Sequence, residues 1–290
     1  MRITPALFIG LTLIAAPLMA APPKDLVKAE LLADVASVQP GQPFTAGILL
    51  KMKPKWHVYW KNPGDAGTAP SVEWKLPEGF VAGELKFPLP VRFEQPGPVI
   101  GYGYEDEVLL TATITPPDSL PTGDRVEFAA EVAWLVCEEV CIPGKAQLEL
   151  ALPAGDSTSP ANAELFDRWR QQLPEALHER TDQAQLIRQV GIRPDPEAGS
   201  GAATAFVVWR ERPDDVQWFP APPEMCGVEN MQTNERPEMS ELSFALAPEP
   251  RGPAEMQFLV TFTDTKGKRR GVEFGVKLPP VAQQPITPSP

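Results

Sequence analysis

The sequence contains few of the residues that hold metal ions. Its 290 residues include three cysteines and two histidines. His57 and His178 do not form a His pair, and no two cysteines have the CxxC spacing that begins a tetrahedral metal site. A glycine-rich phosphate loop and a Ser/His/Asp arrangement are also missing. We therefore expect the chain to work without a bound metal, flavin or nucleotide.

Long apolar runs are scarce as well. The one run of signal-peptide length spans residues 6–16, between the positive charge of Arg2 and a small-residue cleavage site at 18–20. This run is too short to cross a membrane. We therefore predict a secretory signal peptide at 1–20 and a mature chain that is exported without membrane insertion. Disulfides form and persist outside the cytoplasm.

Positive charge is in deficit. The formal net charge is −12, and the lysines and arginines are scattered along the chain. An acidic chain with scattered bases suits neither nucleic acid nor an anionic membrane surface. We expect neither as a partner.

Proline, in contrast, is abundant, with 36 residues against an average usage of about 5%. Proline and glycine turns separate short runs in which apolar and polar residues alternate. This pattern predicts an all-β chain that begins with an antiparallel β-sandwich. The strands expected in the first half are 29–38, 43–52, 56–60, 71–76, 107–115, 126–136 and 145–152.

A helix is predicted near the middle of the chain, with Ser159 as its N-cap, Pro160 in its first turn and Pro174 at its end. We expect domains at 21–155 and 156–280, the second a smaller β-sandwich that opens with this linker helix, and a disordered proline-rich tail at 281–290. One large β-domain with an inserted helix is the alternative. The expected later strands are 205–212, 216–221, 241–248, 256–264 and 271–278.

Two cysteines lie close together in AWLVCEEVCIPGKAQLEL, residues 133–150. If the flanking runs form a hairpin, Cys137 and Cys141 face each other within reach of a disulfide. So small a ring adds little stability, which favours a redox role over a structural one. Glu138 and Glu139 disfavour a thiolate, which favours a reductant. A structural disulfide, a redox dithiol and half of a metal site all remain open on these grounds.

Three segments of the first half resemble a known family. WHVYWKNPGDAGTAPSVEWKLPEGF (56–80), YGYEDEVLL (102–110) and WLVCEEVCIPGKAQLEL (134–150) are similar to the periplasmic N-terminal domain of the DsbD family, in particular its ScsB-like branch. The resemblance covers about residues 25–155. It implies an immunoglobulin-like sandwich in the periplasm, with a cysteine pair that takes electrons from a membrane domain and passes them to oxidised proteins.

The resemblance also implies roles for particular residues. Cys137 and Cys141 match the redox pair, with Cys141 expected to contact the partner and Cys137 to resolve the mixed disulfide. Segments 56–62 and 93–104 are expected to shield the pair, although Trp56, Tyr59 and Trp60 also fit a sandwich core. GYGYEDE looks too glycine-rich and acidic for a packed strand. The expected shield residues are Trp60, Asn62, Tyr102, Tyr104 and Trp134.

The chain departs from the family pattern after its first half. Full-length DsbD-type reductases continue into a membrane domain and a thioredoxin-like domain with a CxxC motif, and this sequence has neither. As a reductase module it is expected to receive electrons from a separate membrane protein and to act on periplasmic thioredoxin-like or oxidised proteins. A non-catalytic adaptor with a structural disulfide is the alternative.

The third cysteine lies in PPEMCGVENMQTNERPEM, a segment that also contains methionines. Cys226, Met225 and Met231 offer soft sulfur ligands that suit Cu(I), and the ScsB-like branch is associated with copper stress. This makes copper handling a further hypothesis. A thiol beside core methionines and an intermolecular disulfide are the competing interpretations.

Overall fold

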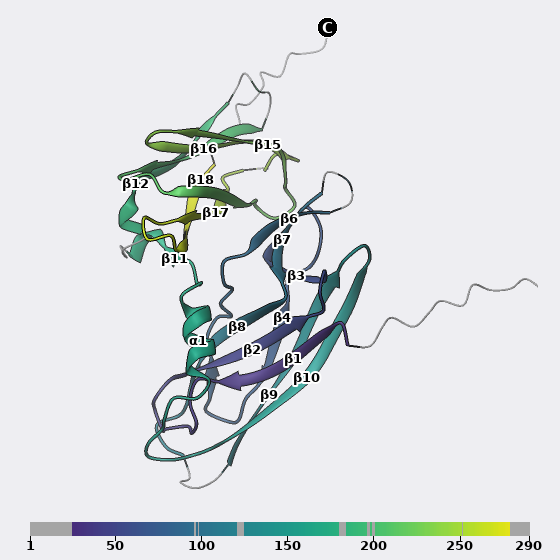
Figure 1. The fold of residues 1–290 in the computed structure, drawn as a ribbon, viewed down its shortest axis with the longest axis vertical. Coiled ribbons are helices and arrows are strands. Elements are labelled where there is room, and N and C mark those ends of the chain that lie inside the picture. Colours follow the sequence, from purple (N-terminus) through teal and green to yellow (C-terminus); the bar gives the residue numbers. More distant parts are fainter. Residues whose placement is uncertain are drawn as a thin grey trace, which may run out of the picture.

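The structure is a computed structural model with two β-sandwiches (Figure 1). It describes residues 25–95, 97, 99–120, 125–179, 184–195, 198, 201–250 and 252–278. The predicted signal peptide at 1–20 and the predicted tail at 281–290 lie outside these residues. The expected all-β class with an immunoglobulin-like first sandwich is confirmed.

The first sandwich has two antiparallel sheets. The smaller sheet has the order β1-β2-β8-β5, with strands Val27–Ala33, Phe44–Met52, Glu107–Thr115 and Val81–Ala82. The larger sheet has the order β10-β9-β3-β7-β6, and β4 also pairs with β9. Its strands are Cys141–Pro153, Arg125–Cys137, His57–Gly64, Val99–Glu105, Val91–Gln95 and Ser71–Lys75 (β4).

The core of this sandwich follows from side-chain alternation. Along β9, the even-numbered residues from Val126 to Val136 are buried, whereas the residues that alternate with them are exposed or half-buried. Across the core, β2 and β8 contribute fully buried residues such as Ile48 and Leu110, which oppose each other. Burying each such side chain contributes roughly 1.5–3 kcal/mol, so this alternation fixes which face of each strand turns inward.

The helix α1 spans Ala163–Arg170 and packs on the first sandwich. Its buried residues Phe166 and Trp169 belong to the first hydrophobic core, and the Phe166 ring lies over Gly47 of β2. The helix ends before Pro174, as its sequence predicts. By its packing, the helix therefore belongs to the first sandwich, which precedes it in the chain.

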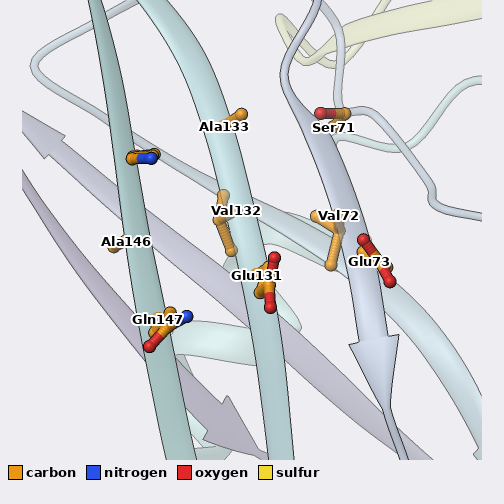
Figure 2. Close-up of a pocket in the computed structure, with 9 residues that line it drawn as sticks. Ser71, Val72, Glu73, Glu131, Val132, Ala133, Ala146 and Gln147 are labelled. Atoms are coloured by element: carbon orange, nitrogen blue, oxygen red, sulfur yellow. The ribbon is translucent and has the colours of Figure 1, made fainter.

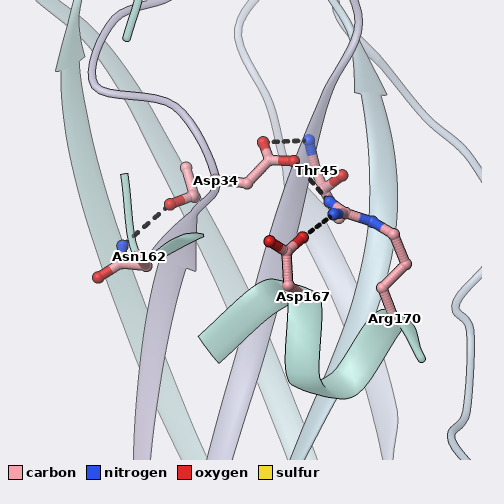
Figure 3. Close-up of polar contacts among 6 residues, drawn as sticks. Asp34, Thr45, Asn162, Asp167 and Arg170 are labelled. Carbon is pink, nitrogen blue, oxygen red and sulfur yellow. Dashed lines mark hydrogen bonds and ion pairs between the residues drawn. The ribbon is translucent and has the colours of Figure 1, made fainter. Parts of the chain in front are cut away.

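The N-terminal end of α1 differs from the expectation. The N-cap is Asn162, not Ser159, and its side-chain amide donates to the carbonyl oxygen of Ala33 at 2.9 Å. Asp34 accepts from the backbone N–H of Thr45 at 2.8 Å and pairs with Arg170 at 3.2 Å (Figure 3). The Asn162 contact fixes the start of the helix, which local capping preference alone did not identify, and the Arg170 pair holds its last turn.

The second sandwich has two four-stranded sheets. One has the order β11-β18-β17-β14, with strands Glu175–Ala176, Arg269–Lys277, Glu255–Thr263 and Asp214–Ala221. The other has the order β12-β13-β16-β15, with strands Ile187–Pro194, Ala202–Trp209, Met239–Ala247 and Gly227–Arg236. The 3-10 turns η1 (Leu177–Glu179) and η2 (Ala184–Leu186) precede β12.

The two sandwiches share an apolar contact. Phe219 of β14 and Leu259 of β17 belong to the hydrophobic core of the first sandwich and are at most 1% exposed. The Phe219 ring lies edge-on to Trp60 of β3 at 6.1 Å and to Tyr102 of β7 at 5.0 Å. The second sandwich therefore packs against strands β3 and β7 of the larger sheet.

Candidate functional site

The β9–β10 hairpin brings Cys137 and Cys141 together. The two strands pair in antiparallel register from Arg125 opposite Pro153 to Cys137 opposite Cys141. The cysteines form a disulfide, and their Cα atoms are 4.2 Å apart. The hairpin predicted from the flanking sequence is therefore present, and the disulfide closes the ring at its turn.

The two sulfur-bearing residues differ in exposure. Cys137 is 1% exposed, whereas Cys141 is exposed on the outermost strand of the sheet. Val140, in the turn between them, is 62% exposed. Cys141 and the turn are therefore accessible to an approaching protein, whereas Cys137 is covered.

A row of side chains crosses four strands at the disulfide. Cys141 of β10 pairs with Cys137 of β9, Cys137 pairs with His57 of β3, and His57 pairs with Glu105 of β7. Directly opposed residues point to the same face of a sheet. The disulfide, the imidazole and the carboxylate therefore share the outer face of the larger sheet.

Tyr59 contacts both sulfur atoms. It follows His57 by two residues and so lies on the same face of β3. Its hydroxyl donates to Cys137 Sγ at 3.1 Å and lies 3.8 Å from Cys141 Sγ. A hydroxyl donor at this position stabilises a Cys137 thiolate whenever the disulfide opens.

Phe93 of β6 completes the aromatic group. Its ring centroid is 4.1 Å from that of His57 and 6.1 Å from that of Tyr59. Gly101 of β7 provides the space, because a Cβ there would lie 2.2 Å from the Phe93 ring. Gly67 makes space for the Tyr59 ring, because a Cβ at position 67 would lie 2.4 Å from that ring. Its φ of +114° also favours glycine. We call His57, Tyr59 and Phe93 the outer-face rings.

Burial sets the charge state of the imidazole. His57 is 7% exposed, and desolvation lowers its pKa below the usual value. The imidazole is therefore neutral at pH 7. A neutral ring beside a disulfide adds no charge that would attract or repel a thiolate.

Comparison with known proteins agrees with this geometry. Residues 24–153 match the family described as thiol:disulfide interchange protein DsbD, N-terminal. The match covers the first sandwich, which is therefore similar to the DsbD N-terminal domain family, and it ends before the second sandwich. The family and the Cys137–Cys141 disulfide together indicate a role in thiol–disulfide exchange. No curated protein matches the chain.

The fold is similar to that of solved structures. The N-terminal periplasmic domain of ScsB from Proteus mirabilis superposes with a TM-score of 0.65 at 18% identity, covering 89% of this chain and 96% of that chain. The DsbD N-terminal domain of Neisseria meningitidis, in the reduced form, matches with a TM-score of 0.28 at 12% identity, covering 49% of this chain and 95% of that chain.

Most of the residues expected to shield the pair lie elsewhere in this DsbD-type domain. Trp60 alternates with Tyr59 and faces the core, and Trp134 faces the same core three residues before Cys137. Tyr102 contacts Phe219, and the Tyr104 hydroxyl donates to the carbonyl oxygen of Pro88 at 2.8 Å. Strand alternation explains why these residues do not shield the pair, because Cys137 points outward whereas these four rings point inward.

Asn62, the fifth expected shield residue, lies where the two sandwiches meet. Its side-chain amide donates to the carbonyl oxygen of Pro220 at 2.7 Å. The rings beside Cys137 are Tyr59 and His57, and Phe93 packs on both of them. Their signal in the sequence is the alternation within WHVYW, which puts His57 and Tyr59 on one face and Val58 and Trp60 on the other.

The segment GYGYEDE forms a packed strand, which corrects the expectation from its composition. It runs from Gly101 of β7 through Asp106 to the first residue of β8, and Tyr102 and Tyr104 are 2% and 4% exposed. The glycines alternate with the tyrosines, so that the outer face is flat and the inner face is filled. Burial raises the pKa of both tyrosines well above the usual value, so both hydroxyls stay protonated.

The three sulfur-bearing residues around Cys226 differ in exposure. Met225 is 91% exposed, whereas Cys226 and Met231 are partly buried against the second core. Cys226 is a free thiol. The described residues contain no group of three or more His, Cys, Asp or Glu side chains that could hold a metal. The copper hypothesis therefore gains no support.

A shallow groove runs along the outer face of the same sheet (Figure 2). Strands β4, β9 and β10 form it, and Ala133 on its floor lies on the same face of β9 as Cys137. Glu73 of β4 and Glu131 of β9 are cross-strand neighbours in the groove, and Lys145 of β10 also lines it. The groove therefore carries charges of both signs.

Among the residues that the structure describes, we find no helix long and apolar enough to span a membrane.

Proposed function

We propose that the first domain is the electron-carrying module of a periplasmic thiol–disulfide exchange system. The observation that carries the proposal is the asymmetry of the pair: Cys141 is exposed, whereas Cys137 is buried and accepts a hydrogen bond from Tyr59. A bond used only for stability does not need one accessible sulfur and one shielded leaving group. Similarity of the first sandwich to the DsbD N-terminal family supports the same role.

Reduction of the domain begins at Cys141. A donor thiolate attacks Cys141 Sγ, the Cys137–Cys141 bond breaks, and Cys137 leaves as a thiolate that the Tyr59 hydroxyl stabilises. The donor's second thiolate then attacks the donor sulfur in the mixed disulfide and releases Cys141. The donor dithiol becomes a disulfide, and its two electrons and two protons end on Cys137 and Cys141.

Oxidation by a partner protein reverses these steps. The Cys141 thiolate attacks a sulfur of the partner's disulfide, forms a mixed disulfide and releases one partner thiolate. The Cys137 thiolate then attacks Cys141 Sγ, re-forms the internal bond and releases the second partner thiolate. The two protons of the dithiol pass to the partner, which becomes reduced.

The proposal places the chain in the periplasm, in the compartment named for the similar ScsB domain. The electron donor is a membrane protein, and the acceptors are thioredoxin-like proteins or other proteins with an accessible disulfide. In this role the chain is a protein-disulfide reductase module.

The equilibrium reduction potential of the pair tests the proposal. A Cys226→Ser variant is equilibrated in glutathione or dithiothreitol buffers, and the fraction of Cys137–Cys141 disulfide is read by alkylation. We expect about −200 to −270 mV, within the span of thiol exchange proteins. A potential below about −300 mV, or reduction only on unfolding, overturns the proposal and makes the disulfide a structural one.

A further inference from the structure

His57 lies beside the buried cysteine, in the row of residues that crosses the larger sheet at the disulfide. It pairs in antiparallel register with Cys137 of β9 on one side and with Glu105 of β7 on the other. Directly opposed residues in an antiparallel pair have Cβ atoms about 4.5–5.5 Å apart, on the same face. The imidazole is therefore the cross-strand neighbour of the sulfur that leaves when the disulfide opens.

Burial makes this a place where a single charge is costly and a pair of opposite charges is not. Cys137 is 1% exposed and His57 is 7% exposed. The Phe93 and Tyr59 rings pack on the imidazole, with centroid distances of 4.1 and 5.4 Å. Opposite charges attract each other more strongly in such a site than in water, whereas an unpaired charge loses its hydration. A Cys137 thiolate that forms here is therefore stabilised by a positive partner.

The groups that surround the imidazole and the buried sulfur come from five strands and the turn of the hairpin. The Tyr59 hydroxyl donates to Cys137 Sγ at 3.1 Å. The carboxylates are exposed or half-buried, so water and salt screen their charges. Among these groups, His57 alone can become positively charged. They are Tyr59 on β3, Cys137 on β9, Cys141 on β10, Glu105 on β7, Phe93 on β6, and Glu138 and Glu139 in the turn.

We propose that His57 takes up the proton that accompanies opening of the disulfide, so that the reduced domain holds Cys137 as a thiolate paired with the His57 imidazolium. The inference rests on the proposed function and refines it, because one of the two protons then lies on His57 instead of Cys137. In the oxidised domain, desolvation lowers the pKa of His57 and the ring is neutral at pH 7. The thiolate provides the opposite charge that raises this pKa on reduction.

Electrons and protons balance in both directions. When a donor thiolate attacks Cys141 Sγ, the electron pair of the broken S–S bond goes to Cys137 Sγ. The donor thiol has released one proton to water in becoming a thiolate, and His57 takes one proton from water. On oxidation, the Cys137 thiolate attacks Cys141 Sγ in the mixed disulfide and the partner leaves as a thiolate. His57 then returns its proton to water, and the leaving thiolate takes one up.

The pKa of His57 in each redox state tests the inference. Proton NMR follows the imidazole resonances against pH in the Cys226→Ser protein, before and after reduction by dithiothreitol. The chain has two histidines, so the resonance that disappears in His57→Gln is assigned to His57. An opposite charge about 4–6 Å away shifts a pKa by about 1–3 pH units. We expect the pKa of His57 to rise by an amount in this range on reduction.

Two cysteine variants show whether Cys137 is the partner. On the Cys226→Ser background, Cys141→Ala leaves a free Cys137 thiol whatever the potential of the native disulfide, and Cys137→Ala leaves the exposed Cys141. We expect the pKa of His57 to be higher in Cys141→Ala than in Cys137→Ala. The ultraviolet absorbance of the Cys137 thiolate in Cys141→Ala should appear at a higher pH when His57→Gln is added, because the positive partner is gone.

Glu105→Gln is the matched control. It removes the charge on the other side of His57, but that charge is present in both redox states, so the rise in the pKa of His57 on reduction should keep its size. A pKa that does not rise on reduction, or that is equal in the two cysteine variants, overturns the inference. If circular dichroism shows that Cys141→Ala does not fold, the chemically reduced protein decides the question. The proposed function is judged on the equilibrium potential, so either idea can fail while the other stands.

Discussion

Aromatic residues lie on both faces of the larger sheet, but they contact different groups on each face. On the inner face, Trp60, Tyr102 and Tyr104 are buried in the hydrophobic core and support the second sandwich. On the outer face, His57 and Tyr59 come from the same strand as Trp60 and lie against a disulfide. What differs is the neighbour across the strand, which is a core side chain on one face and a sulfur atom on the other.

This comparison shows that an aromatic residue near a reactive pair in sequence need not touch it. A shift of one residue along a strand moves a side chain to the opposite face of the sheet. Substitutions on the outer face are therefore expected to change the reactivity of the disulfide. Substitutions on the inner face are expected to change the stability of the domain. The following predictions test that division.

The largest effect is expected at the exposed sulfur. Cys141→Ala should abolish transfer to a partner disulfide, because the accessible nucleophile is gone. Cys137→Ala should instead trap the partner as a stable mixed disulfide on Cys141. Non-reducing electrophoresis with an oxidised thioredoxin-like protein checks both. Equal trapping by the two variants would contradict the assignment of Cys141 as the attacking sulfur.

Neither cysteine substitution should greatly destabilise the domain. The disulfide closes a ring of five residues, and the stabilisation from loop closure grows with the number of residues enclosed. Thermal unfolding of both variants measures this. A large fall in melting temperature in each would identify the bond as a structural one.

A large loss of stability is expected on the inner face. Trp134→Ala removes a ring that packs on Gly144 and fills the first core, so it should lower the free energy of unfolding by about 3–5 kcal/mol. Denaturant unfolding measures the loss. The reduction potential of the folded variant should stay at the wild-type value, since Trp134 faces away from the disulfide. A shifted potential would place Trp134 at the site after all.

A smaller, purely chemical effect is expected at Tyr59. Tyr59→Phe keeps the ring but removes the hydroxyl that donates to Cys137 Sγ, so reduction should slow by about tenfold, since hydrogen bonds to charged groups are worth about 1.5–3 kcal/mol. Stopped-flow reduction by dithiothreitol checks this. The matched control is Tyr104→Phe, which removes an inner-face hydroxyl bonded to Pro88 and should react at the wild-type rate. Equal rates for the two variants would exclude a role for the Tyr59 hydroxyl.

The smallest effect is expected in the pH dependence of stability. Desolvation lowers the pKa of His57 in the folded state, so the unfolded chain binds a proton more readily. Stability should therefore fall as the pH drops below about 6.5, the unfolded pKa of histidine, and level off below the folded pKa. His57→Gln should remove this part of the loss. Denaturant unfolding at pH 7.5 and pH 5 measures it.

Much of the fold could be predicted from local pattern. The bounds expected for β8, 107–115, coincide with the strand, and those for β2, β4 and β9 differ by a residue or so. Strands β4 and β9 alternate because one face is buried more than the other, whereas β2 and β8 are continuous apolar runs whose two faces are both covered. Strand β7 could not be predicted this way, since its glycines have no side chains to alternate and its burial depends on rings from other strands.

The site was predictable only in part. The spacing of Cys137 and Cys141 and their apolar flanks predicted a hairpin, and the structure has it. The outer-face rings were not found, because their proximity depends on pairing between residues far apart in the chain. Cys137 meets His57 across 80 positions, and Phe93 reaches that face only because β6 folds back on β7.

The sequence by itself determined the β-sandwich class, the cysteine hairpin and the resemblance to the DsbD N-terminal domain, because alternation, turn residues and short spacings are local properties of the chain. Only the tertiary structure decided which rings touch the disulfide, that Cys137 is buried and Cys141 exposed, and that the second sandwich supports the strands beside them. Strand register and domain packing set these features, and both arise from the burial of apolar surface between segments that the sequence keeps apart.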